Sequence, residues 1–271
     1  MIGIFDSGIG GLSVFREIRK LLPDEKYIYF SDNAHCPYGE KPKEYIIDRA
    51  RTITGFMLEN GADIIVVACN TATAAAIGTL RAEYSDPADK GVYDRVMRLT
   101  GGRRDHILFI GMEPAIKPAA SLTGTGVVGV LATAGTLNAE KYKDTRGKYA
   151  DGVRVVEHIG KGFVELVESG QTDGPETEAV IAESLEPLLN EGADTIVLGC
   201  THYPFLKDTI AKVASTLTPD RSITIIDPAP AVARHTLDLM TAEGTIKREG
   251  FSLSLHASGN PAILENMAGS I

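Results

Sequence analysis

Two of the three cysteines, Cys69 and Cys200, are the residues whose type and position best suit chemistry. Residues 61–72 read GADIIVVACNTA and residues 192–203 read GADTIVLGCTHY, and six of these twelve positions are identical. In each segment an apolar run leads into the cysteine and polar residues follow it. A thiol at the start of a helix gains thiolate character from the partial positive charge there. The repeated pattern therefore indicates a pair of acid/base thiols rather than two incidental buried cysteines.

The elements that must position these thiols follow an α/β pattern. Short β-branched runs alternate with segments of helical periodicity, and the apolar runs are continuous, as in strands covered on both faces. Helical periodicity is clearest over Leu12–Leu22 and Glu176–Asn190. The strands that we expect are Ile2–Phe5, Tyr27–Ser31, Ile64–Ala68, Ile107–Gly111, Val127–Leu131, Val153–Glu157, Thr195–Gly199, Ile223–Ile226 and Phe251–Leu255.

A second, weaker repeat supports a duplicated architecture. IGIFDSGIGG (residues 2–11) resembles VGVLATAGT (residues 128–136), which aligns Ser7 with Thr133. Cys69 follows Ser7 by 62 residues, and Cys200 follows Thr133 by 67. Because order and spacing both repeat, we favour two pseudo-symmetric α/β domains with mainly parallel sheets over a coincidence between buried strands.

Four polar segments should lie at the carboxyl ends of strands, where open α/β sheets bind ligands. They are Asp6–Gly8, Cys69–Thr71, Thr133–Thr136 and Cys200–His202. Their hydroxyls, amide and backbone donors suit a small carboxylate. If the two domains face each other across a cleft, the thiols approach one ligand from opposite sides. Such a pair could take a proton from one face of a carbon and return one to the other, which is racemisation without a cofactor.

Composition narrows the class of protein and of partner. The net charge of −9 opposes tight binding to nucleic acid, which depends on basic side chains. The chain has neither an apolar run of membrane-spanning length nor a signal-peptide pattern, so we expect a cytoplasmic protein. Three widely spaced cysteines fit reduced thiols. The Cys200–His202 spacing is a poor zinc pattern, and we expect no metal.

Several motifs closely resemble those of the glutamate racemase family, which supplies D-glutamate for peptidoglycan and so serves cell-wall biogenesis and cell shape. The similarity runs from Ile2 to about Met240 and is interrupted at 86–106. The motifs, in the family's order, are DSGIGG at 6–11, PYGEK at 37–41, ACNTATAA at 68–75, VLATAGT at 130–136 and LGCTHYP at 198–204.

This resemblance implies a fold, a reaction and a set of site residues. The domains would be residues 1–112 with 228–271, including an insertion at 86–106, and residues 113–227, with the active site in the cleft between them. Cys69 and Cys200 would be the two bases of a cofactor-independent 1,1-proton transfer, with Cys69 acting on D-glutamate and Cys200 on L-glutamate. We also expect a homodimer. The further catalytic residues would be Asp6 beside Cys69, His202 beside Cys200, and Glu168. The substrate-binding residues would be Asp6, Ser7, Tyr38, Gly39, Asn70, Thr71, Thr133, Thr136, Thr201 and His202.

Other candidate functional residues are weaker. Cys36 has no counterpart in the repeat, so we interpret it as structural, as we do His158 and His235. Whether Glu165 or Glu168 lies near the second thiol is undecided. We expect the polar segment 86–106 to be a connection peripheral to the chemistry.

Two alternative functions stay open. The first is an enzyme of the same fold that acts on another substrate: related two-cysteine proteins racemise aspartate or hydantoins, and one-cysteine relatives decarboxylate or isomerise dicarboxylates. The second alternative is a noncatalytic amino-acid sensor, which would not need both thiols.

Overall fold

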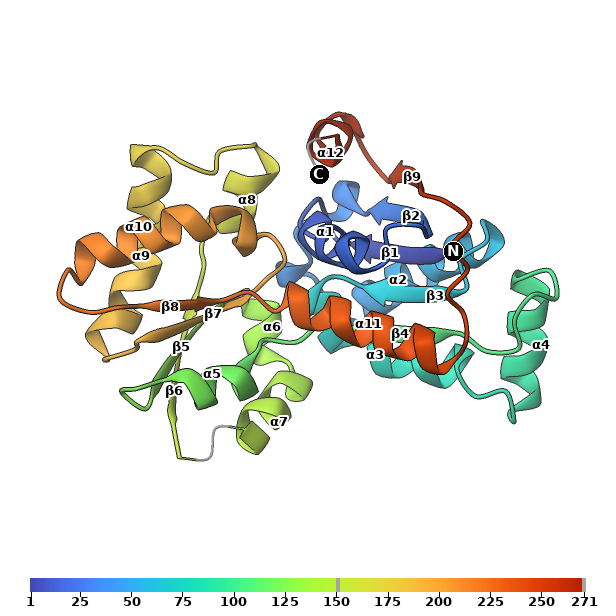
Figure 1. The fold of residues 1–271 in the computed structure, drawn as a ribbon, viewed down its shortest axis with the longest axis horizontal. Coiled ribbons are helices and arrows are strands. Elements are labelled where there is room, and N and C mark those ends of the chain that lie inside the picture. The colour runs from blue at the N-terminus through green and yellow to red at the C-terminus, as the bar shows by residue number, and fades with distance from the viewer. Residues whose placement is uncertain (150–151, 270–271) are drawn as a thin grey trace. The chain divides into compact units, whose positions relative to one another are not determined.

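The computed structural model, which describes residues 1–149 and 152–269, confirms the α/β class with two parallel sheets. Every expected strand is present, and its ends differ from the expected bounds by at most two residues. The chain divides into two compact units (Figure 1). The first unit consists of residues 1–112 and 229–271, and the second of residues 113–228. Among the described residues, no helix is both long and apolar enough to cross a membrane.

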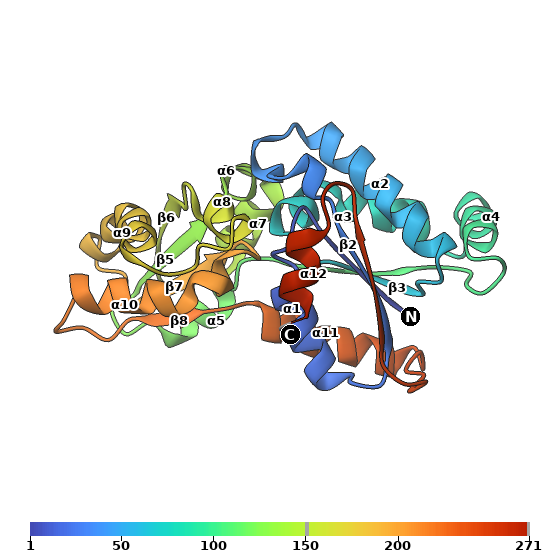
Figure 2. The same ribbon diagram turned by 90° about the horizontal axis from the view of Figure 1, so that it is seen from above.

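The first unit is built on a five-stranded parallel sheet in the order β4-β3-β1-β2-β9. Helices α2 and α3 pack on one face of the sheet, and α1 and α11 lie on the other (Figure 2). The strands are β1 (Ile2–Asp6), β2 (Lys26–Ser31), β3 (Ile64–Val67), β4 (Leu108–Gly111) and β9 (Ser252–Ala257). The helices are α1 (Leu12–Leu21), α2 (Lys43–Glu59), α3 (Asn70–Tyr84), α4 (Lys90–Leu99), α11 (Ala229–Ala242) and α12 (Ala262–Ala268), with the short 3-10 helices η1 (Asn33–His35) and η2 (Tyr38–Glu40).

The second unit has a four-stranded parallel sheet in the order β6-β5-β7-β8. Helices α5 and α7 contribute to an apolar cluster on one face, and α9 and α10 pack together on the other (Figure 1). The strands are β5 (Val127–Ala132), β6 (Arg154–Ile159), β7 (Thr195–Gly199) and β8 (Thr224–Ile226). The helices are α5 (Ile116–Leu122), α6 (Ala134–Asn138), α7 (Glu140–Tyr149), α8 (Phe163–Glu168), α9 (Pro175–Asn190) and α10 (Lys207–Leu217), with the 3-10 helix η3 (Tyr203–Leu206).

The two sheets repeat the same topology and the same register. Strands β4-β3-β1-β2 of the first sheet correspond in order to β8-β7-β5-β6 of the second. Phe5 pairs with Val67 where β1 meets β3, and Leu131 pairs with Leu198 where β5 meets β7. These are the positions that the two sequence repeats align. The cysteines that follow β3 and β7 are therefore structurally equivalent within their units.

Burial explains why the strands were recognisable from sequence. All residues of β1, β3 and β7 are buried, because helices cover both faces of each sheet. The clearest amphipathic helix, α1, turns Leu12, Phe15 and Ile18 into the core, as its periodicity predicts.

The segment 86–106 differs from the expected polar connection, because it contains the helix α4. Asp89 caps this helix: its Oδ1 accepts hydrogen bonds from the backbone N–H of Gly91 at 2.7 Å and of Val92 at 3.2 Å. Val92 and Val96 join the core cluster of the first unit. The two valines, four residues apart among charged neighbours, gave only a short helical signal.

Candidate active site

The first thiol, Cys69, lies between the end of β3 and the start of α3. It is the N-cap of that helix, and its Sγ accepts a hydrogen bond from the backbone N–H of Ala72 at 3.4 Å. The thiol lies 3.7 Å from the hydroxyl oxygen of Ser7, to which it can donate. Since β1 and β3 are neighbours, their carboxyl ends bring Ser7 and Cys69 together. Both residues belong to the polar segments that the sequence places at the carboxyl ends of strands.

Asp6 is fully buried at the end of β1 and organises the loop that carries Ser7. Its Oδ2 accepts hydrogen bonds from the backbone N–H of Gly8 at 3.2 Å and of Gly11 at 3.1 Å. A Cβ on Gly11 would lie 2.8 Å from both the Cβ of Asp6 and the hydroxyl of Tyr29. The DSGIGG sequence thus needs glycine at position 11 so that the backbone can close around the carboxylate.

Asn70 carries a buried amide beside the first thiol. The residue is only 3% exposed, and among the residues that the structure describes neither Oδ1 nor Nδ2 of Asn70 has a hydrogen-bond partner. A buried polar group without a partner costs about 1–3 kcal/mol. The amide is therefore available to a ligand. Thr71, the next residue, is also buried.

The second thiol, Cys200, begins a chain of polar side chains in the second unit. Its Sγ lies 3.7 Å from Nδ1 of His202, and Nε2 of His202 lies 2.6 Å from Oε1 of Glu168. His202 is 1% exposed, so the carboxylate of Glu168 fixes an imidazole that has little access to water. Cys200, His202 and Glu168 thus lie together in the second unit, where the sequence had left the choice between Glu165 and Glu168 open.

Glu165 occupies a different place from Glu168 although both belong to α8. Glu165 is exposed, and its negative charge affects the pKa of Tyr203. Complete burial raises the pKa of Tyr203 far above its usual value, and negative charge on Cys200 or Glu165 raises it further. Tyr203 therefore remains a neutral packing group, whose hydroxyl donates to the carbonyl oxygen of Gly160 at 3.2 Å. Of the two acids, Glu168 is the one paired with His202.

The remaining expected residues lie at the same ends of the two sheets. Thr133 caps α6: its Oγ1 accepts from the backbone N–H of Thr136 at 3.3 Å, and the two hydroxyl oxygens are 3.0 Å apart. Thr201 is buried beside Cys200. Tyr38 and Gly39 form part of η2, which packs against α3 in the first unit.

Two residues near this end of the first sheet were missed by sequence reasoning. Asp32, directly after β2, is completely buried and is bound by Arg49 from α2 and by the hydroxyl of Tyr38. A possible signal was the position of Asp32 after a buried strand, which it shares with Asp6. Arg49 gave no signal, because a charged residue on a helix is usually solvated.

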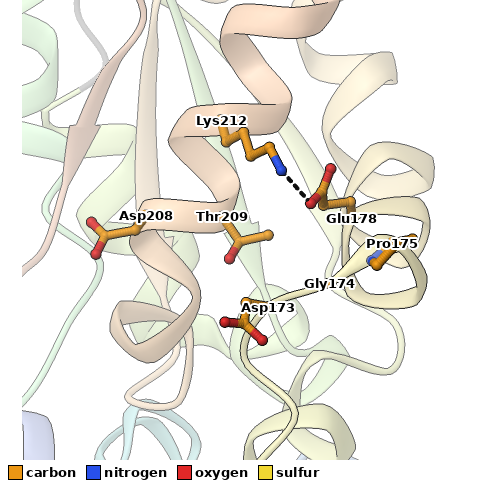
Figure 3. A pocket seen from close by; sticks show the side chains of 7 residues that line it. All are labelled: Asp173, Gly174, Pro175, Glu178, Asp208, Thr209 and Lys212. Atoms are coloured by element: carbon orange, nitrogen blue, oxygen red, sulfur yellow. Dashed lines mark hydrogen bonds and ion pairs between the residues drawn. The ribbon is translucent and has the colours of Figure 1, made fainter.

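A separate hollow in the second unit, of about 510 Å³, has a mixed acidic and basic lining (Figure 3). Nζ of Lys212, on α10, binds Oε1 of Glu178, on α9, at 2.6 Å. The hydroxyl of Thr209 donates to the carbonyl oxygen of Thr172 at 2.7 Å. Neither thiol is among the lining residues, which are Asp173, Gly174, Pro175, Glu178, Asp208, Thr209 and Lys212.

Comparisons with known proteins, by sequence and by structure, relate this chain to one family. Residues 106–236 match the model of the Asp/Glu/Hydantoin racemase family. A glutamate racemase from Methylococcus capsulatus is 46% identical over 262 residues, which cover 96% of this chain and 87% of that protein. The chain belongs to the glutamate racemase family. A second family member, from Herpetosiphon aurantiacus, is 43% identical over 263 residues, covering 96% of this chain and 93% of that protein.

Solved structures of glutamate racemases share the fold. The glutamate racemase isoform from Bacillus anthracis aligns with a TM-score of 0.82 at 29% identity, covering all of this chain and 92% of that one. The Thermus thermophilus glutamate racemase, solved with β-chloro-D-alanine, aligns with a TM-score of 0.76 at 33% identity, covering 99% and 91%. The family is one of amino-acid racemases, a class of isomerases, and the α/β fold expected from sequence agrees with these structures.

Proposed function

We propose that this chain interconverts L- and D-glutamate by a 1,1-proton transfer between two thiols, without a cofactor. The observation that carries the proposal is the equivalence of Cys69 and Cys200. Each follows the corresponding strand of a duplicated sheet in the same register, and each has its own polar support. A duplicated pair of acid/base groups suits a reaction that treats two mirror-image substrates alike.

In the proposed mechanism one thiol is ionised and the other protonated when substrate binds. The thiolate removes the α-proton, and the thiol of the other unit protonates the opposite face of the carbon. The reverse reaction exchanges the two roles. Because the α-proton is weakly acidic, preorganised donors must stabilise the charge that develops on the α-carboxylate. The backbone N–H groups near Ser7, Asn70, Thr71 and Thr201 are suited to this task, as is the orphan amide of Asn70.

Asp6 and His202 have supporting roles in this proposal. His202 transfers or stabilises a proton at Cys200, and Glu168 holds its imidazole ring. Asp6 supports the Cys69 side by fixing the loop that presents Ser7 to the thiol. Ser7, Tyr38, Gly39, Thr71, Thr133, Thr136 and Thr201 would complete the substrate-binding surface.

The similarity to glutamate racemases favours glutamate as the substrate of this chain. The Escherichia coli glutamate racemase was solved with L-glutamate and an activator, and the Francisella tularensis enzyme with D-glutamate. Aspartate remains the main competitor, since the family model includes aspartate and hydantoin racemases. Parallel assays with both amino acids would separate these substrates. A noncatalytic sensor would bind one of them without changing optical rotation.

The thiol roles are tested by Cys69→Ala and Cys200→Ala, with Cys36→Ala as the matched control. Each thiol serves one face of the α-carbon, so neither can replace the other. We expect either active-site variant to lose at least about 10²–10⁴ in rate, measured by circular dichroism with metal chelated and no pyridoxal phosphate added. Cys36→Ala should remain active. Near-normal turnover by Cys69→Ala or Cys200→Ala would contradict the two-thiol mechanism.

The biological setting and assembly follow from the same proposal. We propose that the D-glutamate produced enters peptidoglycan synthesis in the cytoplasm and that the protein forms a homodimer. Rescue of a bacterial strain that requires D-glutamate would support the first point, and failure of an active protein to rescue it would count against it. The mass in solution, from light scattering, tests the second: a monomer at working concentration would contradict the dimer.

A further inference from the structure

A completely buried carboxylate, Asp32, forms the centre of a hydrogen-bond network outside the two thiol groups already described. Nε and Nη2 of Arg49 donate to Oδ2 and Oδ1 of Asp32 at 2.9 and 2.7 Å, which is the two-pronged geometry of a strong charged pair. The hydroxyl of Tyr38 donates to Oδ2 at 2.5 Å. A buried charge is costly unless it is well paired, so Asp32 requires these partners.

Strand β9 and the turn after it, near the C-terminus of the chain, pack beside this network. Strand β9 lies beside β2 and ends next to Asp32. In the turn that follows, the hydroxyl of Ser258 accepts from the backbone N–H of Ala34 at 3.1 Å. The side-chain amide of Asn33 donates to the carbonyl oxygen of Asn260 at 2.6 Å and accepts from the N–H of Gly259 at 2.7 Å. The turn 258–260 thereby fixes residues 32–34 from outside the sheet.

Electrostatics agree with an ionised Asp32. Burial by itself would raise the pKa of this carboxyl, but hydrogen bonds from Arg49, Tyr38 and Ser258 outweigh that effect and hold its pKa below the usual value. An ionised carboxylate can only accept hydrogen bonds. The proton of the Tyr38 hydroxyl is therefore directed at Asp32, and a turn of the hydroxyl to another acceptor would remove one of the hydrogen bonds that this buried carboxylate receives.

The other end of the network reaches the first thiol. Tyr38 belongs to the same buried cluster as Cys69, and η2 packs against α3, the helix that Cys69 caps. Burial and then Asp32 raise the pKa of Tyr38, and negative charge on Cys69 adds to the rise. The second sheet ends at β6 in the described part of the chain, so Cys200 has no equivalent of the β9 turn in its own unit.

We propose that Arg49, Asp32 and Ser258 are positioning residues for the Cys69 half of the reaction, holding Tyr38 and the loop 36–39 against this thiol. The inference rests on the proposed racemisation but concerns only one of its two proton-transfer steps. Weakening the network should slow proton transfer at Cys69 and leave the step at Cys200 unchanged. It should also loosen the packing of Tyr38 and the loop 36–39 against Cys69 and make this thiol more accessible, whether or not a substrate is present.

The main test compares Arg49→Met with Arg51→Met. Both arginines belong to α2 and bind carboxylates, but Arg51 binds Glu83 and Asp48 on the surface. We expect Arg49→Met to lower kcat/KM by about 10²-fold, the cost of a small misplacement of a reacting group, and Arg51→Met to leave it unchanged. Arg49→Lys should recover part of the loss, because it restores the charge without the two-pronged geometry.

Primary deuterium isotope effects on kcat/KM identify the affected step. The effect should increase for the α-deuterated enantiomer that Cys69 deprotonates and should not increase for the other. A Cys69→Ser variant measured in the same way shows which enantiomer that is. General destabilisation would reduce the active fraction of the enzyme and leave both isotope effects unchanged.

Ser258→Ala tests the same network if Arg49→Met does not fold, because it removes a single exposed hydroxyl. Ser254→Ala, on the exposed side of β9, is its matched control. We expect a smaller loss than for Arg49→Met, with the same isotope pattern. Equal changes for both enantiomers, or no change in either variant, would overturn the positioning role.

A second readout does not depend on racemisation. The rate of alkylation of Cys69 by iodoacetamide, followed by peptide mass spectrometry and normalised to Cys200, should rise in Ser258→Ala and not in Ser254→Ala. A wild-type protein that is inactive on glutamate would refute the proposed function. An unchanged Cys69-to-Cys200 alkylation ratio would refute the network even in a fully active enzyme.

Discussion

At the scale of single residues, the two thiols are equivalent in position but are supported differently. Cys69 has the hydroxyl of Ser7 at 3.7 Å, whereas Cys200 has the imidazole of His202 at 3.7 Å with Glu168 behind it. The sequence repeat predicted the equivalence, because it aligned the cysteines and the strands before them. It could not predict the pairing of Glu168 with His202, since residues 34 positions apart meet only through the packing of α8 against η3.

This difference predicts a directional effect of Glu168→Gln. Removing the negative charge should weaken the support of His202 and lower kcat unequally for the two enantiomers. For His202→Asn we expect kcat to fall by about 10²-fold or more, and the loss for Glu168→Gln should be smaller. L- and D-glutamate have equal free energy, so kcat/KM must remain equal in the two directions and KM must shift with kcat. Glu165→Gln, on the same helix, should have little effect. Asp6→Asn should give the opposite bias.

Full progress curves from each enantiomer, fitted with an equilibrium constant of unity, measure this bias. If Glu168→Gln and Asp6→Asn favour the same direction, the assignment of one supporting group to each thiol is wrong. If Glu165→Gln matches Glu168→Gln, the hydrogen bond to His202 is not the cause.

At the scale of elements, the strands were predictable and the segment 86–106 was not. Strands such as β3 and β7 are covered on both faces, so they appear in the sequence as continuous apolar runs. Helix α4 contributes only Val92 and Val96 to the core, and its other residues resemble those of a solvated loop. A short amphipathic helix at the edge of a unit has too few buried positions for its period to stand out.

The buried face of α4 predicts a stability effect. Val96 is 0% exposed, so Val96→Ala should lower the free energy of unfolding by about 2 kcal/mol and leave kcat nearly unchanged. Asp94→Ala, on the exposed face of the same helix, should change it by no more than about 0.5 kcal/mol. Urea unfolding followed by circular dichroism checks both values. Equal stability of the two variants would show that α4 is not part of the core.

At the scale of the whole molecule, duplication explains both the success of the sequence analysis and its gaps. The repeated topology follows from two copies of one pattern of strands and helices, and this pattern is visible in the repeats. Strand β9 and the turn 258–260 belong only to the first unit, so no internal comparison could show their contact with Asp32. Strand β9 itself was expected from the sequence, but its contact with residues 31–34, which breaks the symmetry, was not.

Racemisation of L-glutamate in heavy water tests the central claim most directly. If Cys69 and Cys200 act as separate bases, the D-glutamate formed early should carry deuterium at the α-carbon while the remaining L-glutamate keeps its protium. Cys36→Ala should give the same labels. Mass spectrometry after chiral separation would read both pools. D-glutamate that retains the original protium would show that one group serves both faces, and it would contradict the two-thiol account.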